Sequence, residues 1–253
     1  MIIKIEEINM PKYIFFDTET TGPNKEDRII QVGAMIFDEN DNVEIFDELC
    51  YSDVEMKIEA MITHGITPDD IEDKPSFQES IFYKRVQELN NPQNYIIAHN
   101  MPFDMGMLQK ENFESQLKII DTLRVARDVL EGEESHALQY LRYSLKLYKE
   151  EKSAANKYDI EIKAHDAIGD VLVMKLLFNR LYTLIEERYP DIDPYEKMEE
   201  ITKTPKILEL FPFGKYKGQK ISDIIEKDKA YATWMCENVD HLDLKVTLSK
   251  LLG

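Results

Sequence analysis

Two carboxylates lie one residue apart at the end of an apolar run, in the segment 13–22, which reads YIFFDTETTG. Side chains on a strand point to alternate faces, so Asp17 and Glu19 are expected on one face, close together. Two like charges that close raise the pKa of one of them, and a hard cation such as Mg²⁺ or Mn²⁺ removes this cost. A solvated strand end is the usual explanation of a single pair of this spacing, but the following turn of Thr20, Thr21 and Gly22 lets a ligand approach the backbone and favours metal-assisted chemistry here.

Two further acids follow in regions of the same character. Asp104 comes after the apolar run 94–98, in the first turn of an expected helix, where Pro102 costs no hydrogen bond and a negative charge is favoured. Asp170 opens a long apolar-rich helix, five residues after His165. Five helical residues separate two side chains by about 140° around the axis. His165 must therefore precede the helix if both side chains are to reach one site.

Three segments resemble, in chain order, the motifs of the DEDDh-type 3′–5′ exonucleases, and an element near the C-terminus makes the chain most similar to exodeoxyribonuclease X-like proteins. The three segments are FDTETTG at 16–22, AHNMPFDMGML at 98–108 and AHDAIGD at 164–170. The resemblance implies an α/β ribonuclease H-like exonuclease fold, with a mixed central β-sheet flanked by helices. It also implies stepwise removal of nucleoside 5′-monophosphates from a 3′ end.

The same resemblance assigns roles to the titratable residues. Asp17 is expected to bridge two Mg²⁺ (or Mn²⁺) ions, with Glu19 and Asp170 on the ion that holds the attacking water. Asp104 is expected on the second ion. His165 is the expected general base, because a histidine pKa of about 6.5 suits proton transfer at neutral pH. The neighbouring acid, Asp166, is expected to point to solvent; the alternative is that its negative charge raises the pKa of His165.

Substrate contacts are implied on the same grounds. The segment 63–67, THGIT, resembles one that packs against the terminal nucleotide, with Ile66 as a wedge under a base; an ordinary glycine turn explains it equally well. The full set of expected substrate-binding residues is Thr18, Thr20, Gly22, His64, Ile66, His99, Asn100 and Phe103.

A second region of resemblance lies near the C-terminus. The string FPFGKYKGQK at 211–220 is similar to an element of exodeoxyribonuclease X-like proteins, and residues 206–220 carry four lysines against Glu209. Two glycines flank Lys215, Tyr216 and Lys217, which predicts an exposed hairpin tip that contacts DNA through a stacked aromatic ring and two cations. A structural glycine turn with solvated lysines is the simpler alternative.

Length and patterning favour one sizeable domain and a small module. The chain has 253 residues, and three successive strands followed by helices alternating with single strands indicate a mixed sheet. The expected exonuclease domain is 1–188, the linker 189–205 and the C-terminal module 206–253. Strands are expected near 13–17, 29–38, 43–50, 94–98 and 119–121. Helices are expected near 76–89, 102–111, 122–129, 136–147 and 166–188, the first with a capping box at Ser76 and Glu79.

Composition limits the setting. The net charge of −18 is opposite to that of a protein that binds phosphates through its surface. Binding to nucleic acid is therefore expected to be weak, salt-sensitive and poorly processive without a partner or a separate basic surface. No apolar run reaches the roughly 18–20 residues of a membrane span, so no membrane partner is expected. Two cysteines provide no disulfide framework, which favours the cytoplasm.

The sequence thus predicts a metal-dependent exonuclease acting on DNA 3′ ends, in single strands or frayed duplexes, during DNA repair or replication proofreading. In the proofreading case a replicative polymerase is an expected partner. Two alternatives stay open. One is an exoribonuclease that uses the same site on RNA 3′ ends. The other is a catalytically silent nucleic-acid-binding module.

Overall fold

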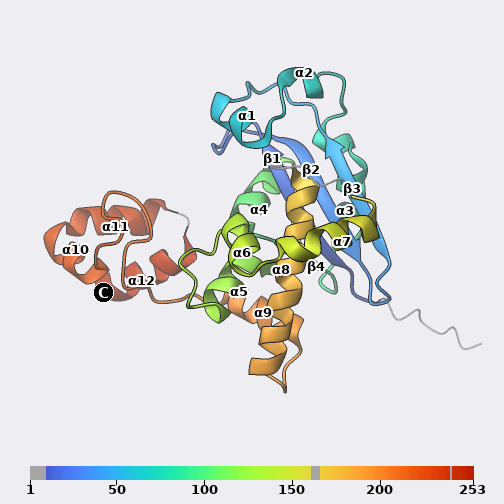
Figure 1. Ribbon diagram of the computed structural model, residues 1–253. Helices are drawn as coiled ribbons and strands as arrows, with labels where there is room; N and C mark the ends of the chain where they lie inside the picture. The colour runs from blue at the N-terminus through green and yellow to red at the C-terminus, as the bar shows by residue number, and fades with distance from the viewer. Residues whose placement is uncertain (1–9, 161–165, 240) are drawn as a thin grey trace, which may run out of the picture. The chain divides into compact units, whose positions relative to one another are not determined.

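The computed structural model describes residues 10–160, 166–239 and 241–253 (Figure 1). Contacts divide the chain into two compact units, residues 1–199 and 200–253, each of which is treated by itself. In the described residues, the strands are β1 (Tyr13–Thr20), β2 (Ile29–Phe37), β3 (Val43–Leu49), β4 (Tyr95–Ala98) and β5 (Lys118–Asp121). The helices of the first unit are α1 (Ile58–His64), α2 (Pro68–Ile71), the 3₁₀ helix Phe77–Glu79, α3 (Ile81–Glu88), α4 (Met101–Lys110), α5 (Thr122–Val129), α6 (Leu138–Ser144), α7 (Tyr148–Tyr158) and α8 (Ala167–Arg188).

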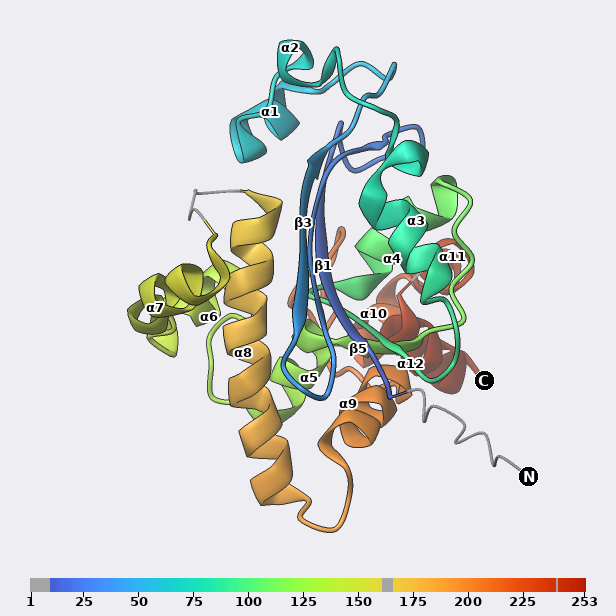
Figure 2. The same cartoon turned by 90° about the vertical axis from the view of Figure 1, so that its right-hand side faces the viewer.

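The strands form one mixed sheet in the order β3-β2-β1-β4-β5. β1 pairs antiparallel with β2 and parallel with β4, and β4 pairs parallel with β5. Every residue of β2 is buried, as expected for a strand covered on both faces. Figure 2 shows α8 on one side of the sheet and α3 and α4 on the other. The expected mixed sheet between helices is therefore confirmed.

Aromatic side chains mark the two covered faces. Phe15 packs edge-on against Phe178 of α8, with ring centroids 5.0 Å apart. Its neighbour Phe16 stacks on Phe82 of α3 at 6.3 Å. The alternation of the strand thus determines which face of β1 meets which helix, and Asp17 and Glu19 continue the α8 face of Phe15.

Several boundaries differ from those expected. β1 runs on to Thr20, past the expected end at residue 17, with an irregular register between Glu19 and Thr20. The helix expected at 76–89 is divided, because Ser80 adopts an extended ψ of 157° between the 3₁₀ turn and α3. The capping box of Ser76 and Glu79 is confirmed. Helices α1, α2 and α7 were not expected.

The range expected as a linker, 189–205, contains a helix, α9 (Pro194–Lys203). Asp193 Oδ1 accepts hydrogen bonds from the backbone N–H groups of Tyr195 (2.9 Å) and Glu196 (3.1 Å), as a helix cap does. Tyr195 stacks on Tyr13 at the start of β1, with centroids 4.1 Å apart. A proline at the first helical position begins this helix instead of preventing it. The expected domain boundaries remain predictions.

The second unit has its own core. Its described residues form three helices that follow α9: α10 (Ile221–Lys227), α11 (Lys229–Asn238) and α12 (Leu242–Leu252). Its buried residues include Phe211, Ile224, Met235 and Leu248. A single antiparallel bridge joins Leu210 to Lys220 and closes the loop between them.

Candidate active site

The first two carboxylates face the start of α8. Asp17 lies opposite Gly33 in the antiparallel pair of β1 and β2, and opposite residues share a face of the sheet. A Cβ atom at Gly33 would come within 2.3 Å of the Ala167 carbonyl carbon. Helix α8 therefore crosses directly over this part of the sheet. Asp170 lies in its first turn, on the side of the sheet to which Asp17 and Glu19 point.

Asp104 approaches from the first turn of α4, where it is 3% exposed. Its Oδ1 accepts a 2.8 Å hydrogen bond from the hydroxyl of Thr18, the residue between the two β1 carboxylates. This bond fixes the Asp104 carboxylate against the end of β1. Sequence spacing predicted the position of Asp104 on its helix but not this partner.

Asp170 is oriented by a short chain of side chains. Gln139 Nε2 donates a 2.6 Å hydrogen bond to Asp170 Oδ1. Gln139 Oε1 in turn accepts from Arg142 (3.1 Å), and Arg142 forms an ion pair with Glu151. The Asp170 carboxylate is thereby connected to α6 and α7, which the sequence analysis did not include in the site.

The start of α8 is anchored by Gln31 of β2, which is 5% exposed. Its Nε2 donates to Asp166 (2.7 Å) and to Asp47 of β3 (2.9 Å). The expectation that Asp166 points to solvent is therefore wrong, because its carboxylate is the acceptor that holds α8 to the sheet. In the sequence, the one indication of this contact was a polar residue, Gln31, within an apolar strand.

Electrostatics link the carboxylates to one another. Burial raises the pKa of Asp17 well above its ordinary value, and the charges of Asp104, Asp170 and Glu19 raise it further. Burial and the charges of Asp170 and Asp104 raise the pKa of Glu19 to about 8. Burial raises the pKa of Asp104 to about 7, although the hydrogen bond from Thr18 acts in the opposite direction and lowers this pKa. The arrangement is costly unless positive charge is bound.

The donor set fits hard divalent cations. It consists of carboxylate oxygens on several elements, the ligand type that Mg²⁺ and Mn²⁺ prefer. Among the described residues, no group of three Asp, Glu, His or Cys side chains has the geometry to hold a metal ion. Asp104 and Asp170 are instead turned to protein donors, Thr18 and Gln139. Both hydrogen bonds are made to Oδ1, and an ionised carboxylate has acceptor sites for a protein donor and an ion together, so these bonds would be compatible with metal binding.

A cavity of about 460 Å³ opens beside the carboxylates. Of the expected substrate-binding residues, Thr18, Thr20, Gly22, His64 and Phe103 line it. Glu19 also lines it, so the cavity reaches one of the expected ligands. The remaining wall is formed by Pro23, Asn24, Lys57, Glu59, Ala60 and Thr63.

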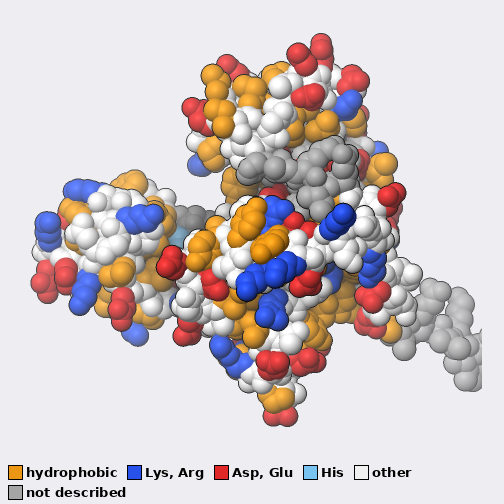
Figure 3. Space-filling model, in the orientation of Figure 1, with side chains coloured by type: hydrophobic (Ala, Val, Ile, Leu, Met, Phe, Trp, Pro, Cys, Tyr) orange, Lys and Arg blue, Asp and Glu red, His pale blue; other side chains and the backbone are white. Residues whose placement is uncertain are grey.

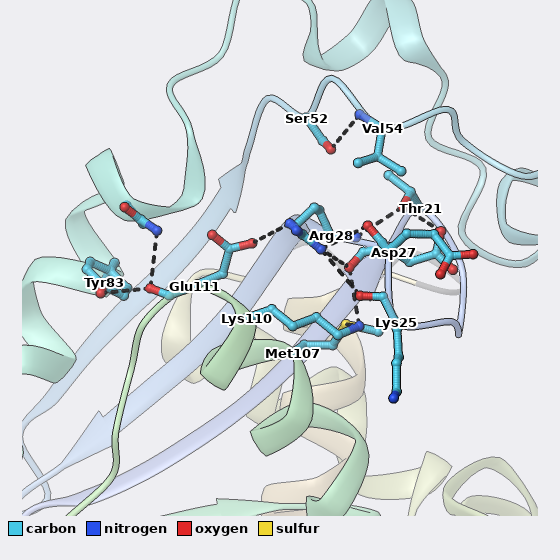
Figure 4. Close-up of polar contacts among 12 residues, drawn as sticks. Thr21, Lys25, Asp27, Arg28, Ser52, Val54, Tyr83, Met107, Lys110 and Glu111 are labelled. Carbon is cyan, nitrogen blue, oxygen red and sulfur yellow. Dashed lines mark hydrogen bonds and ion pairs between the residues drawn. The ribbon is translucent and has the colours of Figure 1, made fainter.

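One cavity wall is fixed by a buried aspartate in the loop after β1 (Figure 4). Asp27 accepts hydrogen bonds from Lys57 Nζ (2.7 Å), the Asn24 N–H (2.6 Å) and the Thr21 hydroxyl (3.0 Å). Lys110 of α4 donates to the carbonyl of Asn24 at 2.7 Å. The loop is thus connected to both α1 and α4. Lys57 supplies a cation at the cavity wall that no sequence motif indicated.

Three expected substrate contacts lie elsewhere. Ile66 is 9% exposed and packs in a cluster with Ile30 and other apolar residues, so its expected role as a wedge under a base is not supported by its burial. His99 contacts the Thr122 hydroxyl (3.0 Å) and the His136 carbonyl (2.9 Å) through its two ring nitrogens. Asn100 precedes α4 with φ 79°, and its N–H donates to Asp121. His165 lies outside the described residues.

The C-terminal loop differs from the exposed tip that was expected. Lys215 and Lys217 are exposed, but Tyr216 is only 8% exposed and its hydroxyl donates to Asp228 at 2.7 Å. Gly214 and Gly218 have φ of 80° and 76°, which turn the loop so that the tyrosine ring folds back onto the unit. Tyr216 is therefore a core residue and not an exposed stacking surface.

The sheet, its covering helices and the carboxylates over the end of β1 define a nuclease fold of the ribonuclease H-like type, and a family model described as exonuclease matches residues 14–178. The chain belongs to this exonuclease family. Enzymes of the family depend on divalent metal ions. A second model, described as exodeoxyribonuclease X-like C-terminal, matches residues 211–240.

Individual relatives agree with this assignment. Exodeoxyribonuclease 10 of Escherichia coli is 28% identical over 243 residues, covering 93% of this chain and 96% of the relative. DNA polymerase III subunit epsilon of Buchnera aphidicola is 30% identical over 145 residues, covering 50% of this chain and 60% of that protein. A solved structure of exonuclease X in complex with 5′ overhanging duplex DNA superposes with a TM-score of 0.53 at 21% identity, covering 76% of this chain and 99% of that chain.

Within the described residues, no helix combines the length and apolar character needed to cross a membrane.

Proposed function

We propose that this chain is a 3′–5′ exodeoxyribonuclease that releases nucleoside 5′-monophosphates with two Mg²⁺ or Mn²⁺ ions. The observation that supports this most is the crowding of acids at one place: burial raises the pKa of Asp17, and the charges of Asp104, Asp170 and Glu19 raise it further. These acids come from β1, α4 and α8. A partly buried set of this kind, beside a cavity of about 460 Å³, suits cation-assisted attack on a phosphodiester.

The proposed roles rest on the positions of the described residues and, for His165, on its sequence motif. Asp17, Glu19, Asp104 and Asp170 would hold the ions, which when bound activate a water and stabilise the leaving oxygen. Thr18 and Gln139 orient two of these acids before the ions bind. Phe103 in the cavity wall offers an apolar surface to the terminal base. His165 is proposed as the base that accepts the proton of the attacking water.

The preference for DNA rests on the relationships of the whole chain. The match to an exodeoxyribonuclease extends over 93% of this chain, and the C-terminal region matches a model named after an exodeoxyribonuclease. A role in DNA repair or in proofreading beside a polymerase follows from the same relatives. We place the protein in the cytoplasm, where its free cysteines, Cys50 and Cys236, would stay reduced.

The test is a cleavage assay on matched DNA and RNA oligonucleotides labelled at the 5′ end, with Mg²⁺, Mn²⁺ or EDTA. Stepwise shortening of DNA with either ion and none with EDTA is expected. Asp17→Ala should abolish cleavage, and His165→Ala should lower kcat by roughly 10²–10⁴. Faster cleavage of RNA would make the exoribonuclease the better assignment, and near wild-type kcat in His165→Ala would reject its role as base.

A further inference from the structure

The second unit carries one large aromatic side chain on its surface. Trp234 of α11 is 53% exposed and is the only tryptophan in the chain. Its ring stacks on that of Tyr231, with centroids 6.4 Å apart and planes 30° apart. The two residues are three positions apart on α11 and so share a face of the helix. The indole therefore rests on a second ring on one side and is open to solvent over much of its surface.

Tyr231 is itself fixed in place. Its ring meets that of Tyr216 edge-to-face at 5.1 Å, and its hydroxyl accepts a 3.1 Å hydrogen bond from the Lys215 N–H. Asp228 caps α11 by accepting the Tyr231 N–H (3.2 Å) and also accepts the Tyr216 hydroxyl (2.7 Å). A Cβ at Gly214 would come within 2.4 Å of the Tyr231 hydroxyl. The loop and the helix together thus hold the row Tyr216, Tyr231 and Trp234.

Lysines accompany this aromatic row. Lys215 Nζ lies 4.6 Å from the Tyr216 ring centroid and 5.9 Å from that of Tyr231, and Lys227 Nζ lies 5.7 Å from Tyr216. Lys215 pairs with Asp228 at 3.0 Å while 61% of its side chain stays exposed. Four further exposed lysines make no ion pair with any residue that the structure describes: Lys217, Lys220, Lys227 and Lys229.

The charge of this unit also departs from that of the chain. Residues 206–253 contain eight lysines and seven acidic residues, for a net charge of +1, so residues 1–205 carry −19. Figure 3 shows lysine side chains at several places on the visible face of the unit. A polyanion meets less repulsion here than elsewhere on the protein, although Glu237 lies one helical turn after Trp234.

We propose that Trp234 and its lysine neighbours form a site for single-stranded nucleic acid, in which a base stacks on the indole and Lys215 contacts the adjacent phosphate. A supported, half-exposed aromatic ring on a unit that also exposes lysines is a combination that suits sequence-tolerant binding of single strands. This inference deepens the proposed function, on which it rests for the class of substrate. It assigns the stacking role to Trp234 of α11 in place of Tyr216, which is buried.

The single tryptophan makes the site directly observable. The full chain in EDTA is titrated with oligothymidylate while the tryptophan fluorescence is recorded, so that no cleavage occurs. Saturable quenching that weakens with added salt is expected. Unchanged fluorescence at oligonucleotide concentrations that saturate binding, measured in parallel by anisotropy of a labelled strand, would overturn the proposal.

Variants separate stacking from folding. By anisotropy, Trp234→Ala should raise the Kd about 5- to 150-fold, the usual range for one base–aromatic stack, and Trp234→Phe should lie between it and the wild type. Leu251→Ala is the matched control, since Leu251 is a similarly exposed (47%) apolar side chain of the same unit, and it should bind as the wild type does. Equal Kd values for Trp234→Ala and Leu251→Ala would also overturn the proposal.

Failure of the inference can be told apart from failure of the proposed function. Quenching by oligothymidylate in a protein that never cleaves DNA, with any divalent ion, would support the site and reject the exonuclease assignment. Cleavage of DNA with the same KM in Trp234→Ala as in the wild type would support the exonuclease assignment and reject the site at Trp234.

Discussion

Thr18 Oγ1 donates a 2.8 Å hydrogen bond to Asp104 Oδ1, joining the middle of the carboxylate pair on β1 to the first turn of α4. Both residues are buried, with 6% and 3% of their surfaces exposed. The bond joins elements that are 86 residues apart in the chain. It makes the position of the third acid depend on a residue that is not itself a ligand candidate.

We predict that Thr18→Val weakens both stability and catalysis. The change keeps the shape of the side chain but leaves the buried Asp104 carboxylate without this donor, which costs about 1–3 kcal/mol. The free energy of unfolding from urea titrations and kcat on a DNA strand should both fall. Thr18→Ser keeps the hydroxyl and should retain most of both. If the two variants behaved alike, the hydrogen bond would have no such role.

A second prediction concerns the contact between β2 and α8. A methyl group at Gly33 would meet the Ala167 carbonyl carbon and the Ile168 nitrogen, each at 2.3 Å, and both are backbone atoms that cannot turn away. Gly33→Ala should therefore displace the start of α8, which carries Asp170. The free energy of unfolding should fall by about 1–3 kcal/mol, as is typical of an overpacked core.

The control is Gly106→Ala in α4, where an added Cβ has no atom within 4 Å. Its expected effect is a gain of about 0.5–1 kcal/mol, from the better helix propensity of alanine. Urea titration and kcat are measured for both variants. A folded Gly33→Ala enzyme with wild-type kcat would show that the close approach does not position Asp170.

A third prediction uses the buried ion pair of the loop after β1. Burial alone would raise the pKa of Asp27, but hydrogen bonds from Lys57, Asn24 and Thr21 lower it below its ordinary value. The stabilisation is thus complete above the unfolded aspartate pKa of about 3.9 and is lost as the pH falls through the lower folded value. Asp27→Asn should destabilise the protein by roughly 1–3 kcal/mol at neutral pH.

The measurement is the free energy of unfolding of wild type and Asp27→Asn at several pH values from about 8 down to 3, spanning the aspartate range. The difference between them should shrink at the acid end. Asp73→Asn, at an exposed pair with Lys74, should differ from the wild type far less than Asp27→Asn does, at every pH. A difference for Asp27→Asn that does not change with pH would contradict the ionic origin of this stabilisation.

The sequence predicted the site where local rules suffice. Strand alternation gave the shared face of Asp17 and Glu19, and a proline at the helix start gave the turn that carries Asp104. Contacts between distant residues could not be obtained in this way. Gln139 reaches Asp170 across 31 positions and Gln31 reaches Asp166 across 135, and no spacing rule covers such pairs.

The same limit explains why the burial of Tyr216 and the helix within 189–205 were not predicted. The glycines around Tyr216 predicted a turn, and a turn is present, but whether the ring faces solvent depends on Tyr231 and Asp228 of a later helix. The prolines of 189–205 suggested an irregular connector. Pro194 instead begins a helix that Tyr195 attaches to β1, a tertiary contact that local sequence does not encode.

The central claim is that Asp17, Glu19, Asp104 and Asp170 form one divalent-cation site, and calorimetric titration of Mn²⁺ into the full chain tests it most directly. Because the chain is acidic overall, the control is Asp69→Asn, which removes a charge from the exposed acidic surface of α2. Saturable binding that is retained in Asp69→Asn and lost in Asp17→Asn is predicted. Absence of binding, or equal binding in both variants, would contradict the claim.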